Sequence, residues 1–171
     1  MKRPDLPFQL LRYQSEASLS KTRHVTEGDR MFGRSDDEWD AVVDDAIGFL
    51  KDQARLRRVT SYTELNAALG QRGHKMFDFT QEIERQAVGA VLSNVTQKTL
   101  GESGVMLSSI VVYLDRNDAG PGFYSLAIQL GLLPNTATAD DKLAFWSGQV
   151  GKVHDLYARP ARKRATNGPS D

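Results

Sequence analysis

The chain has 171 residues, 40% of them hydrophobic and 26% charged, which is the composition of one ordinary globular domain with a modest core. The absence of cysteine excludes disulfides, thiolate metal sites and thiol catalysis. No apolar run approaches the roughly 18 residues that a membrane span needs, and the N-terminus lacks a secretory signal pattern, so we expect a cytoplasmic protein of bacterial type.

The formal net charge is zero, but it is unevenly distributed along the chain. Residues 1–34 contain seven basic and four acidic side chains, and residues 157–171 contain four basic and one acidic. Residues 35–156 contain eleven basic and seventeen acidic side chains. Because both ends lack hydrophobic periodicity, we predict a disordered basic arm over 1–34, one domain over 35–157 and a disordered basic tail over 158–171.

The first predicted helix begins after Ser35 and ends near Arg55. Ser35 and Glu38 have the spacing of a capping box, and the acidic first turn suits the positive end of the helix dipole. Apolar residues recur at three- and four-residue spacing along this segment, as one buried helix face requires: Trp39, Val42, Val43, Ala46, Ile47, Phe49 and Leu50.

Two further helices are expected before residue 100. Ser61 and Glu64 form a second capping box, which predicts a short helix over Tyr62–Leu69 that Gly70 ends. A third helix is predicted from Thr80 to about Lys98. Its apolar face consists of Ile83, Ala87, Val88, Val91, Leu92 and Val95.

The second half of the chain predicts a strand, a turn and two helices. Val105–Leu114 is rich in Val and Ile and predicts a buried strand, and the Gly, Asp and Pro of residues 115–122 predict a turn. Pro121 suits the first position of a helix that ends at Gly131. Thr138 begins a last helix, whose apolar face we expect in the core or in an oligomer contact: Leu143, Trp146, Val150, Val153 and Tyr157.

The order of these elements predicts a mostly α-helical fold with a small β element. A short helix, a second helix, a strand and a loop follow one another as in helix-turn-helix modules with a wing. We therefore predict a winged-helix-like domain with an extra C-terminal helix.

Three motifs stand in order between residues 61 and 123. A helix opening with Ser-Tyr-x-x-Leu is followed by an Ala-Val-Gly run with an Asn nearby, and then by a glycine-rich turn ending in Gly-Phe. The residues are Ser61, Tyr62, Leu65, Ala87, Val88, Gly89, Asn94, Gly122 and Phe123. In these motifs the chain resembles the C-terminal, DNA-binding domain of the alkylguanine-DNA alkyltransferases. Residues 104–131 also resemble a block found in small uncharacterised bacterial proteins.

The chain departs from the alkyltransferases in its chemistry. Leu107-Ser108-Ser109-Ile110 stands in place of their reactive Pro-Cys-His-Arg motif, and Ser93 in place of their intercalating arginine. Because the alkyl acceptor must be a thiolate, the resemblance implies a DNA-binding shape without alkyl transfer. The three histidines are widely separated and no hydrolase or phosphate-loop motif occurs, so we expect no enzymatic activity, no cofactor and no metal site.

The third helix and its flanking basic residues form the candidate DNA surface. From residue 51 to 98 there are eight basic and five acidic side chains, and Arg, Asn and Gln can read base edges. The candidate nucleic-acid-binding residues are Arg57, Arg58, Ser61, Tyr62, Arg72, Lys75, Arg85, Gln86, Ser93, Asn94, Gln97, Lys98 and Arg116. A solvated helix face is the alternative interpretation, because Glu82 and Glu84 would repel phosphates.

Two functions follow from this pattern. The first is a non-enzymatic protein that binds nucleic acid, with double-stranded DNA as its partner, or assists transcription. The second is a protein–protein interaction module of winged-helix shape, which the acidic body favours and which binds no nucleic acid. Neither interpretation includes a membrane as partner, and both leave the oligomeric state open.

Overall fold

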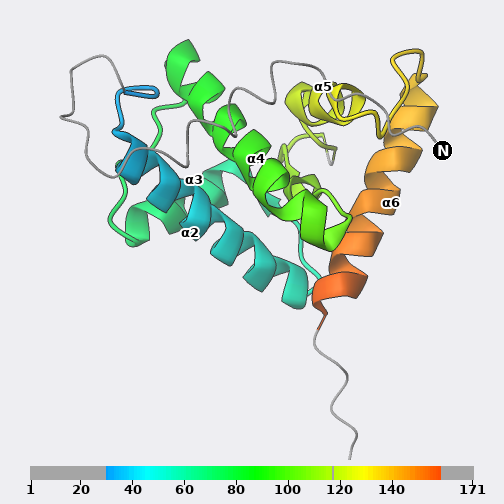
Figure 1. The fold of residues 1–171 in the computed structure, drawn as a ribbon, viewed down its shortest axis with the longest axis horizontal. Helices are drawn as coiled ribbons and strands as arrows, with labels where there is room; N and C mark the ends of the chain where they lie inside the picture. Colours follow the sequence, from blue (N-terminus) through cyan, green and yellow to red (C-terminus); the bar gives the residue numbers. More distant parts are fainter. Residues whose placement is uncertain (1–29, 117, 159–171) are drawn as a thin grey trace, which may run out of the picture. The chain divides into compact units, whose positions relative to one another are not determined.

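The computed structural model describes residues 30–116 and 118–158 (Figure 1). All of these except Arg30 belong to one unit, Met31–Asp171. The described part is mostly helical, with five α-helices, one 3-10 helix and a two-stranded parallel sheet. Most of the predicted basic arm and all of the predicted tail beyond Ala158 lie outside the described residues.

Helix α2, Asp36–Arg55, begins as its sequence predicts. The Ser35 hydroxyl accepts a hydrogen bond from the Glu38 backbone N–H at 3.3 Å, and the Glu38 carboxylate accepts one from the Ser35 N–H at 2.8 Å. Its buried residues are Trp39, Val42, Val43, Ala46, Leu50 and Ala54. The predicted apolar face is therefore confirmed except for Ile47 and Phe49, which are only partly buried.

Helices α3, Tyr62–Gln71, and α4, Glu82–Ser103, are the second and third predicted helices. The capping box at Ser61 is present, but Gly70 lies inside α3 rather than at its end, and the chain turns at Gly73, whose φ is +91°. Helix α4 extends past its predicted end to Gly104, whose φ of +68° stops it. Ile83, expected on the buried face of α4, is exposed.

The prediction of a ten-residue strand over Val105–Leu114 is wrong. This segment forms the 3-10 helix η1, Leu107–Ile110, and the two-residue strand β2, Val111–Val112, which pairs in parallel with β1, Thr60–Ser61. Residues 105–112 are all buried, so their apolar composition reflects burial and not strand geometry. Side chains of the last helix satisfy part of the backbone here, in place of neighbouring strands.

Helices α5, Pro121–Gln129, and α6, Ala139–Tyr157, complete the fold. Pro121 occupies the first turn of α5 and Thr138 caps α6, as predicted. In Figure 1, α4 (green) runs between α2 and α5, and it packs against both. Leu143, expected in the apolar face of α6, is exposed, whereas Trp146 and Val153 are buried.

Candidate nucleic-acid interface

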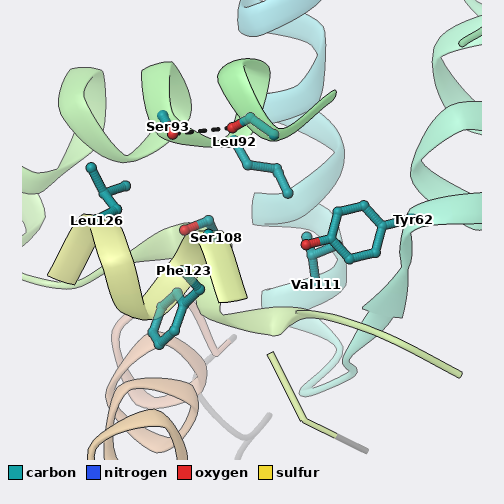
Figure 2. A pocket seen from close by; sticks show the side chains of 9 residues that line it. Tyr62, Leu92, Ser93, Ser108, Val111, Phe123 and Leu126 are labelled. Atoms are coloured by element: carbon teal, nitrogen blue, oxygen red, sulfur yellow. Dashed lines mark hydrogen bonds between the residues drawn. The ribbon is translucent and has the colours of Figure 1, made fainter. Parts of the chain in front are cut away.

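A small hollow of about 30 Å³ lies where α3, α4, η1 and α5 meet (Figure 2). It is lined by Tyr62, Gly89, Leu92, Ser93, Ser108, Val111, Gly122, Phe123 and Leu126. Leu92 and Ser93 reach it from α4, and Phe123 and Leu126 from α5. No charged side chain lines the hollow, which has room for roughly one or two water molecules.

The motifs that resemble the alkyltransferases converge on this hollow. Tyr62 comes from the first motif, Gly89 from the second, and Gly122 and Phe123 from the third. Ser108, which the expected resemblance aligns with a reactive cysteine, lies at the same site. The tertiary structure therefore brings together residues that are widely separated in the sequence.

The serines of η1 are held by neutral partners. The Ser108 and Thr96 hydroxyls are 2.7 Å apart, and the Trp146 indole N–H donates to the Ser109 carbonyl oxygen at 2.8 Å. The Ser109 hydroxyl is buried without a hydrogen-bond partner. Because the partner of Ser108 is another hydroxyl and not a base, these contacts provide no group that would activate Ser108 as a nucleophile.

Residues 112–116 and 118–119 form the two described sides of a hairpin, here called hairpin 112–119, next to the hollow. Val112 and Ala119 form an antiparallel bridge, and the Tyr113 N–H donates to the Asp118 carbonyl oxygen at 3.2 Å. The rings of Tyr62 and Tyr113 stack with centroids 4.8 Å apart. Burial, and then the neighbouring Tyr113, raise the pKa of Tyr62, so its phenol stays protonated at neutral pH.

The hairpin base is anchored to α3 and α5. A Cβ atom added to Gly120 would lie 2.7 Å from the Tyr62 hydroxyl, so only glycine fits there without a shift. The Asp118 carboxylate accepts hydrogen bonds from the Ala119 N–H and from the Tyr124 hydroxyl. Burial, followed by Asp118, raises the pKa of Tyr124, which remains a hydrogen-bond donor.

Most cations of the predicted DNA surface have carboxylate partners. Five of them are paired: Arg57 with Asp155, Arg72 with Asp45, Arg85 with Glu82, Arg116 with Asp115, and Lys98 with both Asp40 and Asp44. The side chains of Arg58 and Lys75 are exposed and have no such partner among the described residues. Asp40, Asp44, Asp45 and Asp155 lie outside residues 51–98, so the fold offsets the positive excess that the sequence has there.

The structure does not bring the predicted site residues together on one surface. Tyr62 and Ser93 line the hollow, whereas Lys98 and Arg72 turn toward α2 and Arg57 toward α6. Ser61 is only 2% exposed and its hydroxyl caps α3, which leaves it unavailable to a partner. Gln86, Asn94 and Gln97 stay at least partly exposed on α4.

Sequence reasoning missed Tyr113 and Leu114, which it assigned to a buried strand. Both are exposed, and Leu114 is the most exposed large apolar side chain among the described residues. The turn signal of residues 115–118 begins only after Leu114, so no local pattern marked the end of the buried segment before Tyr113.

The fold and the hollow define a small, mostly helical protein with a two-stranded parallel sheet. No protein-family model, no curated protein and no solved structure matches the chain. The described residues contain no group of three or more His, Cys, Asp or Glu side chains that could hold a metal ion. None of the helices in that part of the chain is both long and apolar enough to cross a membrane.

Proposed function

We propose that this protein binds double-stranded DNA without catalysing a reaction, through a winged-helix-like module made of α3, α4 and the hairpin 112–119. One observation carries the proposal: the three motifs that resemble alkyltransferases meet at one uncharged hollow. The hairpin takes the place of the wing, and α4 that of the recognition helix. Gln86, Asn94 and Gln97 on α4 have the amide groups that read base edges.

Residues 35–156 have a net negative charge, which implies a modest affinity for DNA. Exposed ion pairs contribute only about 0–1 kcal/mol each, so a DNA phosphate can displace a carboxylate from cations such as Arg85. The two ends of the chain each have a net charge of about +3 in the sequence, and they supply attraction that the acidic body lacks. We therefore expect binding that is strong only at low salt.

The test is a fluorescence anisotropy titration of a labelled duplex with the full chain at two salt concentrations. We expect saturable binding at low salt and a steep loss of affinity at the higher concentration, because bound phosphates release counterions. Absence of binding to any duplex at low salt would contradict the proposal.

A protein–protein interaction module is the second candidate, and the ion pairs favour it. Carboxylates from α2 and α6 pair with cations of the predicted DNA surface, which leaves little free positive charge there. Purification from the native cell separates the two candidates. A stoichiometric protein partner with no retained nucleic acid supports the module, and a complex dominated by DNA excludes it.

A further inference from the structure

We propose that an open groove at the C-terminal ends of α2, α4 and α6 binds a small zwitterion with an apolar side chain, the chemical class of the free aliphatic amino acids. The groove has a volume of about 290 Å³, near the lower end of the range for small-molecule sites. It is lined by Lys51, Thr99, Glu102, Ser103, Leu156 and Tyr157, none of which lines the hollow. The inference is therefore independent of the proposed function.

Three helices supply the walls of the groove. Lys51 lies one turn before the end of α2, Glu102 lies in the last turn of α4, and Tyr157 is the last residue of α6. Figure 1 shows these helix ends close together. The last carbonyl groups of a helix have no partners within the helix and create a partial negative charge there. The end of α4, with the Glu102 carboxylate on it, therefore favours the ammonium group of a ligand.

Two side chains of opposite charge line the groove without pairing with each other. No ion pair within residues 30–116 and 118–158 includes Lys51 or Glu102. The Lys51 ammonium lies 5.8 Å from the centroid of the Tyr157 ring, a cation–π contact that keeps it at the groove. A ligand with both a carboxylate and an ammonium group can form charge-assisted hydrogen bonds with Lys51 and Glu102 at once. A ligand with a single charge would leave one of the two side chains unmatched.

The apolar wall of the groove comes from α6. Leu156 is 51% exposed, and it lines the groove together with Tyr157. Burial, followed by Glu102, raises the pKa of Tyr157, so its phenol stays protonated at neutral pH. The Thr99 and Ser103 hydroxyls already donate to carbonyl oxygens of α4, at 2.8 and 2.7 Å. Selection of a ligand therefore depends on Lys51, Glu102 and the apolar wall.

The experiment titrates the full chain with L-leucine, by calorimetry and by amide NMR shifts. Two analogues keep the leucine side chain and each lack one charge: leucinamide has no carboxylate, and isocaproate has no ammonium group. We expect leucine to bind and both analogues to bind at least about tenfold more weakly, because each loses one charge-assisted contact. The shifts should concentrate at Thr99, Glu102 and Tyr157.

Substitutions test the two charged residues directly. Lys51→Met and Glu102→Gln should each weaken leucine binding by about tenfold or more. Lys152→Met, at an exposed lysine of α6 outside the groove, is the matched control and should bind as the unsubstituted chain does. Circular dichroism melting confirms that each variant is folded.

Several outcomes would overturn the zwitterion site. Absence of leucine binding at millimolar concentration, or equal binding of either analogue, does so with the unsubstituted chain and needs no variant to fold. Unchanged affinity in Lys51→Met or Glu102→Gln also overturns it. Shifts at Gly89 and Phe123 in place of the groove residues would put leucine in the hollow and overturn the assignment. The duplex titration tests the proposed function separately.

Discussion

At the scale of single residues, Ser93 lies where the resemblance expected from the sequence would place an intercalating arginine. Ser93 lines the hollow, and its hydroxyl donates to the Gly89 carbonyl oxygen of the preceding turn at 3.1 Å. It adds no positive charge to the hollow. Because no charged side chain lines the hollow, we expect the folded domain to bind DNA weakly.

We predict that Ser93→Arg increases DNA affinity by about tenfold, because one added phosphate or base contact contributes about 1–3 kcal/mol. Anisotropy at low salt measures the change. Gln71→Arg adds the same charge at the exposed end of α3, and it serves as the control for a nonspecific charge effect. Equal gains from both variants would show that the hollow has no special role in binding.

At the scale of elements, the cap of α3 links the helix to the short sheet. Ser61 belongs to β1 and also caps α3, and the Glu64 carboxylate accepts hydrogen bonds from the Ser61 N–H and the Thr60 hydroxyl, both at 2.9 Å. One exposed carboxylate therefore fixes the junction that holds Tyr62 at the hollow. Loss of this cap affects the site and the stability together.

We predict that Ser61→Ala lowers the free energy of unfolding by about 1 kcal/mol, the usual cost of a lost N-cap. Chemical denaturation at neutral pH measures this change. Thr63→Ala, at the neighbouring exposed position of the same helix, is the control and should change stability by less. If Ser61→Ala leaves the free energy of unfolding unchanged, the β1–α3 junction does not depend on the cap.

The same cap predicts a pH dependence. Hydrogen bonds from the Ser61 backbone, and then from Thr60, lower the pKa of Glu64 below its ordinary 4.5. The folded state thus favours the ionised carboxylate, and its stabilisation is complete above that value and lost as pH falls through the lowered pKa. Glu64→Gln should therefore lose less stability than the unsubstituted chain between pH 5 and about pH 3, measured by thermal melting. Equal losses of stability in the two proteins over this pH range would contradict this assignment.

The apolar segment 105–114 shows how elements can be misjudged. Its Val and Ile content is typical of a strand, but η1 packs against α2, α4 and α6, and only the two residues of β2 pair with β1. The side chains of Trp146 and Gln149 supply backbone hydrogen bonds from the last helix. Such partners lie about 40 residues away in the sequence, so local periodicity carries no sign of them.

At the scale of the whole molecule, Arg34 joins three segments. It is 4% exposed, pairs with Glu84 of α4 at 3.4 Å, donates to the Lys75 carbonyl oxygen at 3.1 Å and lies 4.2 Å from the Phe77 ring centroid. These contacts connect the segment before α2 with the loop between α3 and α4.

We predict that Arg34→Met lowers the free energy of unfolding by about 3 kcal/mol, because it leaves the buried Glu84 carboxylate without its cation. The double variant Arg34→Met, Glu84→Leu should recover much of this loss, since neither charge is then buried alone. Chemical denaturation of both variants is the measurement. A single variant as destabilised as the double one would indicate lost packing instead of an unpaired charge.

Charge also acts over the whole chain. Arg162, Lys163 and Arg164 belong to the basic C-terminal segment of the sequence. We predict that converting all three to Gln lowers the slope of log affinity against log salt by up to about three, if each cation neutralises one phosphate. Arg57→Gln, which removes a cation paired with Asp155, is the control and should change the slope little. An unchanged slope in the triple variant would assign the phosphate contacts to the rest of the chain.

The sequence by itself determined the helices and their starts. Capping boxes at Ser35, Ser61 and Thr138 and the apolar faces of α2 and α4 are local patterns, since hydrogen bonds within one turn and a 3.6-residue period create them. Only the tertiary structure decided that residues 105–112 form η1 and a two-residue strand, and that carboxylates of α2 and α6 neutralise the cations of residues 51–98. Both outcomes depend on contacts between distant segments, and a local pattern contains no information about which distant side chain will satisfy a backbone group or a charge.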